Sequence, residues 1–127
     1  MKKTIILFIA VFIIGSVLTA DETDIKIIAL SLEDEYVLIQ NTGQESIDMS
    51  GWAVTDRYEK HTYVFKNYEL ASNSILQLQS GDKRFRIGKL KEADDYILWT
   101  KRNVWNNMGD TVYLYTGKGK LIAKYSR

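Results

Sequence analysis

The densest group of chemically active side chains is a basic segment in the second half of the chain. Its five cations within nine residues are Lys83, Arg84, Arg86, Lys89 and Lys91. Phe85 stands among them, and Lys101-Arg102 follow between Trp99 and Trp105. Cations beside exposed aromatic rings suit nucleic acid or another polyanion, because the charges follow phosphates while the rings stack on bases. The same residues suit an acidic cell-wall polymer or a membrane surface.

A structural interpretation of this segment stays open beside the binding one. A long surface loop needs charge for solubility, and Phe85, Trp99 and Trp105 would then be core residues beneath it. The exposure of these rings separates the two interpretations. If five phosphates were contacted, the affinity for a single strand would fall with salt with a log–log slope of about −3.5.

The other candidate groups favour structural roles. The acidic clusters Asp21-Glu22 with Asp24 and Glu33-Asp34-Glu35 lack EF-hand spacing, so we expect solvated turns instead of a calcium site. His61 is the single histidine and lies beside Lys60. A catalytic histidine needs a nucleophile and an orienting acid, and the chain has no Gly-x-Ser-x-Gly nucleophile elbow. We therefore expect a surface histidine.

Composition excludes several classes of site. The absence of cysteine excludes disulfides, thiolate nucleophiles, iron–sulfur clusters and Cys-ligated zinc, and one histidine excludes a multi-His metal site. A formal charge of +1 argues against the overall positive field of many nucleic-acid binders but permits a local patch. We expect no catalytic residue, metal or cofactor, and a small secreted hydrolase is the least favoured hypothesis.

Residues 1–20 predict export from the cytoplasm. Lys2-Lys3 precede ten apolar residues, Ile5 to Ile14, and the segment ends in the small residue Ala20. This order is typical of a secretory signal peptide. Residues 4–20 are short for a membrane span, which needs about 20 apolar residues. A cleaved signal peptide and a retained anchor both place residues 21–127 outside the cytoplasm, with membrane contact only through residues 4–20 if they stay uncleaved.

Residues 21–127 predict one all-β domain. Short alternating segments separated by turn residues indicate strands, and an apolar face on each requires two stacked sheets. We therefore expect an antiparallel β-sandwich. The pattern loosens between Gly81 and Gly109, where Lys83–Arg86 start a short helix or a long loop. The predicted strands are Ile25–Leu32, Tyr36–Gln40, Trp52–Asp56, Thr62–Phe65, Ser74–Gln79, Tyr96–Thr100, Thr111–Tyr115 and Leu121–Tyr125.

Five blocks of sequence stand in a characteristic order between residues 24 and 125. They are Glu35–Asn41, Ile47–Asp56, Thr62–Phe65, Leu70-Ala71 and Asn106–Tyr115. In this order the chain resembles the lamin tail domain family in its prokaryotic secreted form. The Ser50-Gly51-Trp52 and Asn107-Met108-Gly109-Asp110 motifs are the most specific parts. The resemblance implies an immunoglobulin-like β-sandwich without catalytic residues. It departs at Leu38, where a charged outward residue is usual, so we expect that face to be covered or to bind something.

The motif residues have structural explanations. Trp52 is expected in the core because a buried indole contributes a large apolar area. Gly51 is expected to adopt a backbone conformation that other residues avoid. Polar motif side chains beside turns are expected to bind backbone groups there. The residues assigned structural roles are Asn41, Gly51, Trp52, Asp56, Gly109 and Asp110.

Three functional hypotheses follow from the sequence. The first is a non-catalytic, secreted or surface-held binding module with an undefined protein or surface partner. The second is a nucleic-acid-binding or other polyanion-binding accessory module that uses residues 83–105. The third is the hydrolase. Salt-dependent binding to single-stranded DNA separates the first two, and the oligomeric state stays open.

Overall fold

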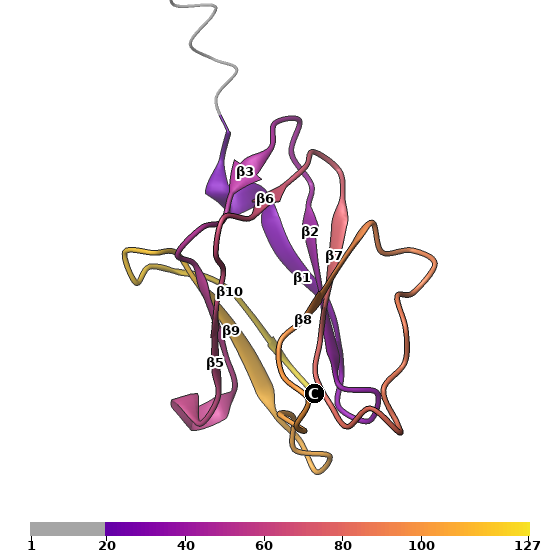
Figure 1. Ribbon diagram of the computed structural model, residues 1–127. Helices are drawn as coiled ribbons and strands as arrows, with labels where there is room; N and C mark the ends of the chain where they lie inside the picture. The colour runs from indigo at the N-terminus through magenta and orange to yellow at the C-terminus, as the bar shows by residue number, and fades with distance from the viewer. Residues whose placement is uncertain (1–19) are drawn as a thin grey trace, which may run out of the picture.

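A computed structural model describes residues 20–127, so the expected signal peptide or anchor lies, apart from Ala20, outside the described residues. Two four-stranded sheets pack face to face (Figure 1). The predicted all-β, immunoglobulin-like sandwich is confirmed. Within the described residues, no helix is long and apolar enough to cross a membrane.

The first sheet has the order β1-β2-β7-β8, and the second has the order β10-β9-β4-β5. The first contains β1 (Ile25–Ser31), β2 (Tyr36–Asn41), β7 (Ile75–Gln79) and β8 (Asp95–Leu98). The second contains β4 (Ala53–Thr55), β5 (Thr62–Val64), β9 (Thr111–Tyr115) and β10 (Leu121–Ser126). A small sheet of β3 (Ile47–Asp48) and β6 (Glu69–Leu70) was not predicted, because two-residue strands carry no periodic pattern. Two 3₁₀ turns are η1 (Glu22–Asp24) and η2 (Arg57–Glu59).

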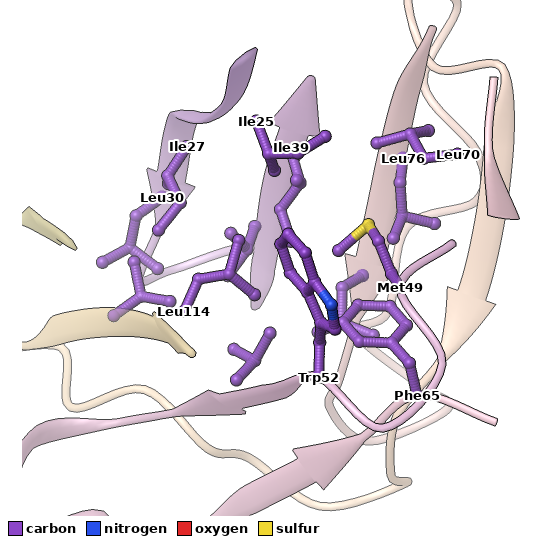
Figure 2. Close-up of a cluster of buried hydrophobic side chains, with 14 of the residues drawn as sticks. Ile25, Ile27, Leu30, Ile39, Met49, Trp52, Phe65, Leu70, Leu76 and Leu114 are labelled. Atoms are coloured by element: carbon purple, nitrogen blue, oxygen red, sulfur yellow. The ribbon is translucent and has the colours of Figure 1, made fainter. Parts of the chain in front are cut away.

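The core lies between the two sheets around Trp52. Its indole is 6% exposed, as expected, and Figure 2 shows it among Ile39, Met49 and Phe65. Gly51 has a φ of +84° where the chain turns into β4, a left-handed conformation that glycine adopts without a steric penalty. In the Ser50-Gly51-Trp52 motif, Gly51 therefore allows the bend that places the Trp52 ring in the core.

One strand differs from its expected environment. The sequence predicts that β1, apolar on both faces, is central or doubly covered. It instead ends its sheet, and a bulge between Ile27 and Ala29 breaks the alternation. Ile27 and Leu30 consequently both face the core, while Ile28 is 38% exposed. The bulge, and not a second covered face, explains the run of apolar residues.

One strand pair departs from the antiparallel expectation. β8 runs parallel to β7, so the chain must cross from one end of the sheet to the other. Residues 81–94, here called the strap, make this crossing on the outside of the first sheet (Figure 1). The Gln77 amide holds the strap by donating to the Gly88 carbonyl at 3.1 Å and accepting from the Leu90 N–H at 2.7 Å. Leu38, which pairs with Gln77, is therefore covered and 4% exposed.

Strand directions divide the connections between the two ends of the sandwich. Residues 32–35, 56–61, 80–86 and 99–110 gather at one end, here called the loop end. Residues 20–24 lie at the opposite end, with the β9–β10 turn at residues 116–120 (Figure 1). The basic segment begins at the loop end, and that end is where the chemistry of the chain is concentrated.

Candidate functional site

The first part of the basic segment is a tight turn, not a helix. The Asp82 carbonyl accepts the N–H groups of Phe85 at 3.0 Å and Arg86 at 2.9 Å. The Asp82 carboxylate accepts the Arg84 N–H at 2.9 Å, which fixes the direction of the chain from inside the turn. Residues 82–86 are here called the basic turn.

An exposed aromatic ring stands on the basic turn. Phe85 is 76% exposed, and the Arg84 guanidinium lies 5.3 Å from its ring centroid, within cation–π range. Arg84 also binds the Asp82 carboxylate through Nε at 3.2 Å and Nη2 at 2.9 Å. These hydrogen bonds hold the pKa of the Asp82 carboxyl at about 2. The turn thus presents a flat ring and an oriented guanidinium to solvent.

The second basic pair lies beside the basic turn. The Gly81 N–H donates to the Arg102 carbonyl at 3.0 Å, so the two segments meet across 21 positions of sequence. Arg86 is half-buried and donates from Nη1 to the Gly81 carbonyl at 3.3 Å. The structure therefore brings together five of the seven predicted cations at the loop end. They are Lys83, Arg84, Arg86, Lys101 and Arg102.

The other two predicted cations do not belong to this group. Lys89 and Lys91 lie on the strap, which runs away from the loop end. The Lys89 ammonium is tied back to the carbonyls of Ala93 and Leu90. A ligand seated on Phe85 would meet the five loop-end cations, not these two lysines.

The two tryptophans that flank Lys101-Arg102 belong to the core. Trp105 is 4% exposed, and Trp99 is half-buried with its ring centroid 5.8 Å from that of Trp105 in an edge-on arrangement. Trp99 also lies 6.1 Å from Tyr63, so aromatic rings close the gap between the two sheets beside β5 and β8. Trp99 and Trp105 therefore pack with the core, as the structural interpretation of the basic segment requires. Phe85 does not, because its ring is exposed.

Acidic groups border the basic turn. A cleft of about 320 Å³ runs beside Phe85 and Arg86, and the exposed residues Glu33 and Asp34 also line it. The surface around Phe85 therefore carries both signs of charge. A ligand there gains from stacking on the ring as well as from electrostatic attraction.

The third acid of that cluster turns inward, contrary to the expected solvated turn. Glu35 is 6% exposed and adopts a φ of +62°. Its carboxylate accepts the Val104 N–H at 2.6 Å, the Trp105 N–H at 3.1 Å and the Ser80 hydroxyl at 2.8 Å. Burial raises the pKa of the Glu35 carboxyl, against the opposing effect of these donors. Glu35 fastens the β8–β9 loop, which carries Lys101 and Arg102, to the β1–β2 turn.

The polar motif residues bind backbone groups, as expected. The Asn41 amide donates to the carbonyls of Glu45 at 2.8 Å and Leu70 at 3.0 Å. The Asp110 carboxylate accepts the N–H groups of Arg57 at 3.0 Å, Asn106 at 3.0 Å and Thr111 at 2.8 Å. Gly109, before it, has a φ of +136°. Each side chain joins segments that are distant in sequence.

Asp56 has a second partner that sequence reasoning missed. Its carboxylate accepts the His61 backbone N–H at 2.8 Å, and its other oxygen lies 2.7 Å from His61 Nδ1. Asp56 is buried, while the His61 side chain is 43% exposed. An acid and a histidine five residues apart across a predicted turn are the sequence signal that could have indicated this pair.

The described residues offer no metal site, and the chain matches one known family. Among residues 20–127, no three acidic or histidine side chains converge to hold a metal ion. A search of curated proteins found no match to the chain. The family model described as Lamin Tail Domain matches residues 18–127 and supports a non-catalytic interaction module. This match agrees with the sandwich, the Trp52 motif and the Asp110 turn, and the chain therefore belongs to the lamin tail domain family.

Proposed function

We propose that this chain is an exported, non-catalytic binding module whose loop end binds a flexible polyanion, specifically single-stranded nucleic acid. The observation that carries the proposal is the exposed Phe85 ring on the basic turn, with Arg84 stacked beside it. A base stacked on such a ring contributes about 1–3 kcal/mol by alanine substitution. Contact between an apolar ring and water is unfavourable. A planar ligand that covers the Phe85 ring would remove this contact, which accounts for the exposed position of the ring.

The arrangement of charges favours a ligand that stacks. Asp82 neutralises part of the charge of Arg84, and Glu33 and Asp34 line the cleft beside Phe85. A purely electrostatic ligand such as an acidic cell-wall polymer would meet this mixed surface without a compensating stacking contact. A single strand places its phosphates on the cations and a base on Phe85.

Export is part of the proposal. Residues 1–20 have the order of a signal peptide, and residues 20–24 lie at the end of the sandwich opposite the loop end. Cleavage or retention of that segment would therefore leave the loop end accessible. Mass spectrometry of protein recovered outside a bacterial expression host tests this: a mass lacking residues 1–20 supports cleavage. Retention of the full-length chain in the cytoplasm would contradict export.

Binding is tested by fluorescence anisotropy with a labelled twelve-residue oligothymidine, dT12. We expect saturable binding, and phosphate contacts from Lys83, Arg84, Arg86, Lys101 and Arg102 alone contribute about −3.5 to the log–log salt slope. The triple substitution Lys83→Ala, Arg84→Ala and Arg86→Ala removes three of these contacts and should reduce the slope by about 2. Phe85→Ala should weaken binding by roughly 5- to 160-fold while changing the slope little.

The matched control removes the same charge elsewhere. Lys26→Ala, Lys66→Ala and Lys118→Ala together take three exposed cations from the opposite end of the sandwich. This variant should bind dT12 as the wild type does. Equal losses from both triple variants would mean that net charge, and not the basic turn, drives binding. No binding of dT12 at about 50 mM salt, where electrostatic affinity is greatest among common conditions, would refute the proposal.

A further inference from the structure

A second cleft lies at the loop end, between η2 and the β8–β9 loop. It has a volume of about 250 Å³ and is here called the His61 cleft. Its buried acids are already satisfied: Asp56 binds the backbone and ring of His61, and Asp110 accepts three backbone N–H groups. Its lining includes Arg57, Tyr58, Lys60, His61 and Trp105.

Two cationic side chains and one imidazole nitrogen are left over in this cleft. Asp56 occupies Nδ1 of His61, so Nε2 is the ring nitrogen available to a ligand, and it donates when the ring is protonated. The Arg57 guanidinium makes one long contact, 3.5 Å from Nη2 to the Thr111 hydroxyl. Lys60 is exposed and has no salt-bridge partner within residues 20–127. Two permanent cations and an oriented imidazole therefore surround the opening.

Trp105 lines the His61 cleft and packs against the core. Trp105 is 4% exposed, and its Nε1 has no hydrogen-bond partner within residues 20–127. Buried indole N–H groups normally have a partner, because an unpaired one costs about 1–3 kcal/mol.

The His61 cleft, like the basic turn, has an exposed aromatic ring directly after an arginine. Tyr58 is 80% exposed and follows Arg57, as Phe85 follows Arg84. Tyr58 and Glu59 both adopt positive φ, +65° and +53°, a strained conformation that costs about 1–3 kcal/mol for each residue. The Asp56 hydrogen bonds close this turn and hold the tyrosine ring in solvent beside the cations.

We infer that the His61 cleft is a second subsite for the same single strand, which binds a phosphate between His61, Arg57 and Lys60 while a neighbouring base stacks on Tyr58. This inference rests on the proposed function, because it extends the ligand from the basic turn across the loop end. The β8–β9 loop carries Lys101 and Arg102 and lines both clefts, through Asn103 beside the basic turn and through Asn106 at the His61 cleft.

The single histidine makes the test specific. Its imidazole resonances in a heteronuclear NMR spectrum report on the cleft without overlap from other histidines. We expect these resonances to shift during titration with dT12, because a phosphate oxygen close to Nε2 changes the surroundings of the ring. The shift should saturate at the same concentrations as the anisotropy. The double variant Arg57→Ala with Lys60→Ala should bind dT12 about 3- to 10-fold more weakly and with a salt slope reduced by about 1.4.

The controls separate this inference from the proposed function. Lys66→Ala with Lys118→Ala removes two cations from the opposite end and should leave dT12 binding unchanged. Tyr58→Phe should retain the affinity that Tyr58→Ala loses, because phenylalanine preserves the stacking face. An unchanged melting temperature of each variant would exclude a loss of binding through unfolding.

The possible results distinguish failure of the second subsite from failure of the proposed function. Binding of dT12 with stationary His61 resonances and an unaffected Arg57/Lys60 variant would refute the second subsite and leave the proposed function intact. Absence of any dT12 binding would refute both. Release of shorter fragments from dT12 would refute both as well, because the proposed module is non-catalytic.

Discussion

Glu35→Gln tests whether one buried carboxylate holds the loop end together. The substitution keeps the size of the side chain and removes its charge. The oxygen that accepts the Trp105 N–H at 3.1 Å, or the one shared by Val104 and Ser80, must become an NH₂ group that cannot accept. At least one buried N–H or hydroxyl therefore loses its acceptor, and the remaining bonds lose their charge-assisted strength.

The magnitude follows from these contacts. An unsatisfied buried donor costs about 1–3 kcal/mol, and relief from burying a charge offsets part of the weakening of the other bonds. We expect Glu35→Gln to lower the free energy of unfolding by about 2–3 kcal/mol. For a domain of this size, that corresponds to a decrease in Tm of about 8–12 °C.

The dependence on pH gives the effect a second signature. Burial raises the pKa of the Glu35 carboxyl above its ordinary value of 4.5, so the folded state binds this proton more tightly than the unfolded chain. The stabilisation from that proton is complete below about pH 4.5 and is lost as the pH rises through the folded-state pKa. Glutamine does not titrate, so the penalty of Glu35→Gln should be larger at pH 4.5 than at pH 7.5.

Urea unfolding followed by circular dichroism measures both effects. Glu33→Gln is the matched control, since Glu33 is an exposed neighbour of the same charge, and it should change stability by less than about 0.5 kcal/mol. A Glu35→Gln variant as stable as this control would refute the role of the carboxylate. A penalty that grows with rising pH would refute the direction of the pKa shift.

Three further predictions concern the core, the strap and the basic turn. Trp52→Ala should lower the free energy of unfolding by about 3–5 kcal/mol in urea titrations, and a loss below 1 kcal/mol would contradict its place at the centre of the core. Gln77→Ala removes both hydrogen bonds to the strap, so trypsin should cut the strap about tenfold faster; unchanged cleavage would mean that other contacts hold it. NMR titration should find the Asp82 carboxyl titrating at about 2, and Arg84→Ala should move it towards 3.8. Because the pKa of Asp82 is lowered, its pairing stabilises the turn above about pH 3.8 and is lost as the pH falls through 2, and an unmoved titration in the variant would contradict this.

Local patterns predicted the strands because each strand has one face in the core. Val112 and Leu114 alternate with outward residues in β9, and the structure buries both completely. The pattern failed where a bulge changed the alternation at Ile28, and where β3 and β6 were too short to show one. It also could not indicate that β8 runs parallel to β7, because strand direction depends on the path of the strap.

The sequence predicted which basic and aromatic residues form the candidate site, but it did not predict how they are arranged in space. The basic segment and its rings are visible in the sequence, but the sequence could not separate Phe85, which is exposed, from Trp99 and Trp105, which pack against the core. Lys89 and Arg102 have the same charge, yet the strap carries Lys89 away while a hydrogen bond to Gly81 brings Arg102 in.

The amino-acid sequence by itself determined the two-layered β-fold, the core position of Trp52 and the turn-binding roles of Asn41 and Asp110. Residue type, side-chain alternation and turn chemistry indicate these features over a few positions of sequence, although the fold supplies the distant partners Leu70 and Arg57. Tertiary structure alone decided that Glu35 turns inward to residues 69 and 70 positions away and which cations share the loop end. Such contacts depend on sheet register and on the route of the crossover, because these bring distant segments within hydrogen-bonding distance.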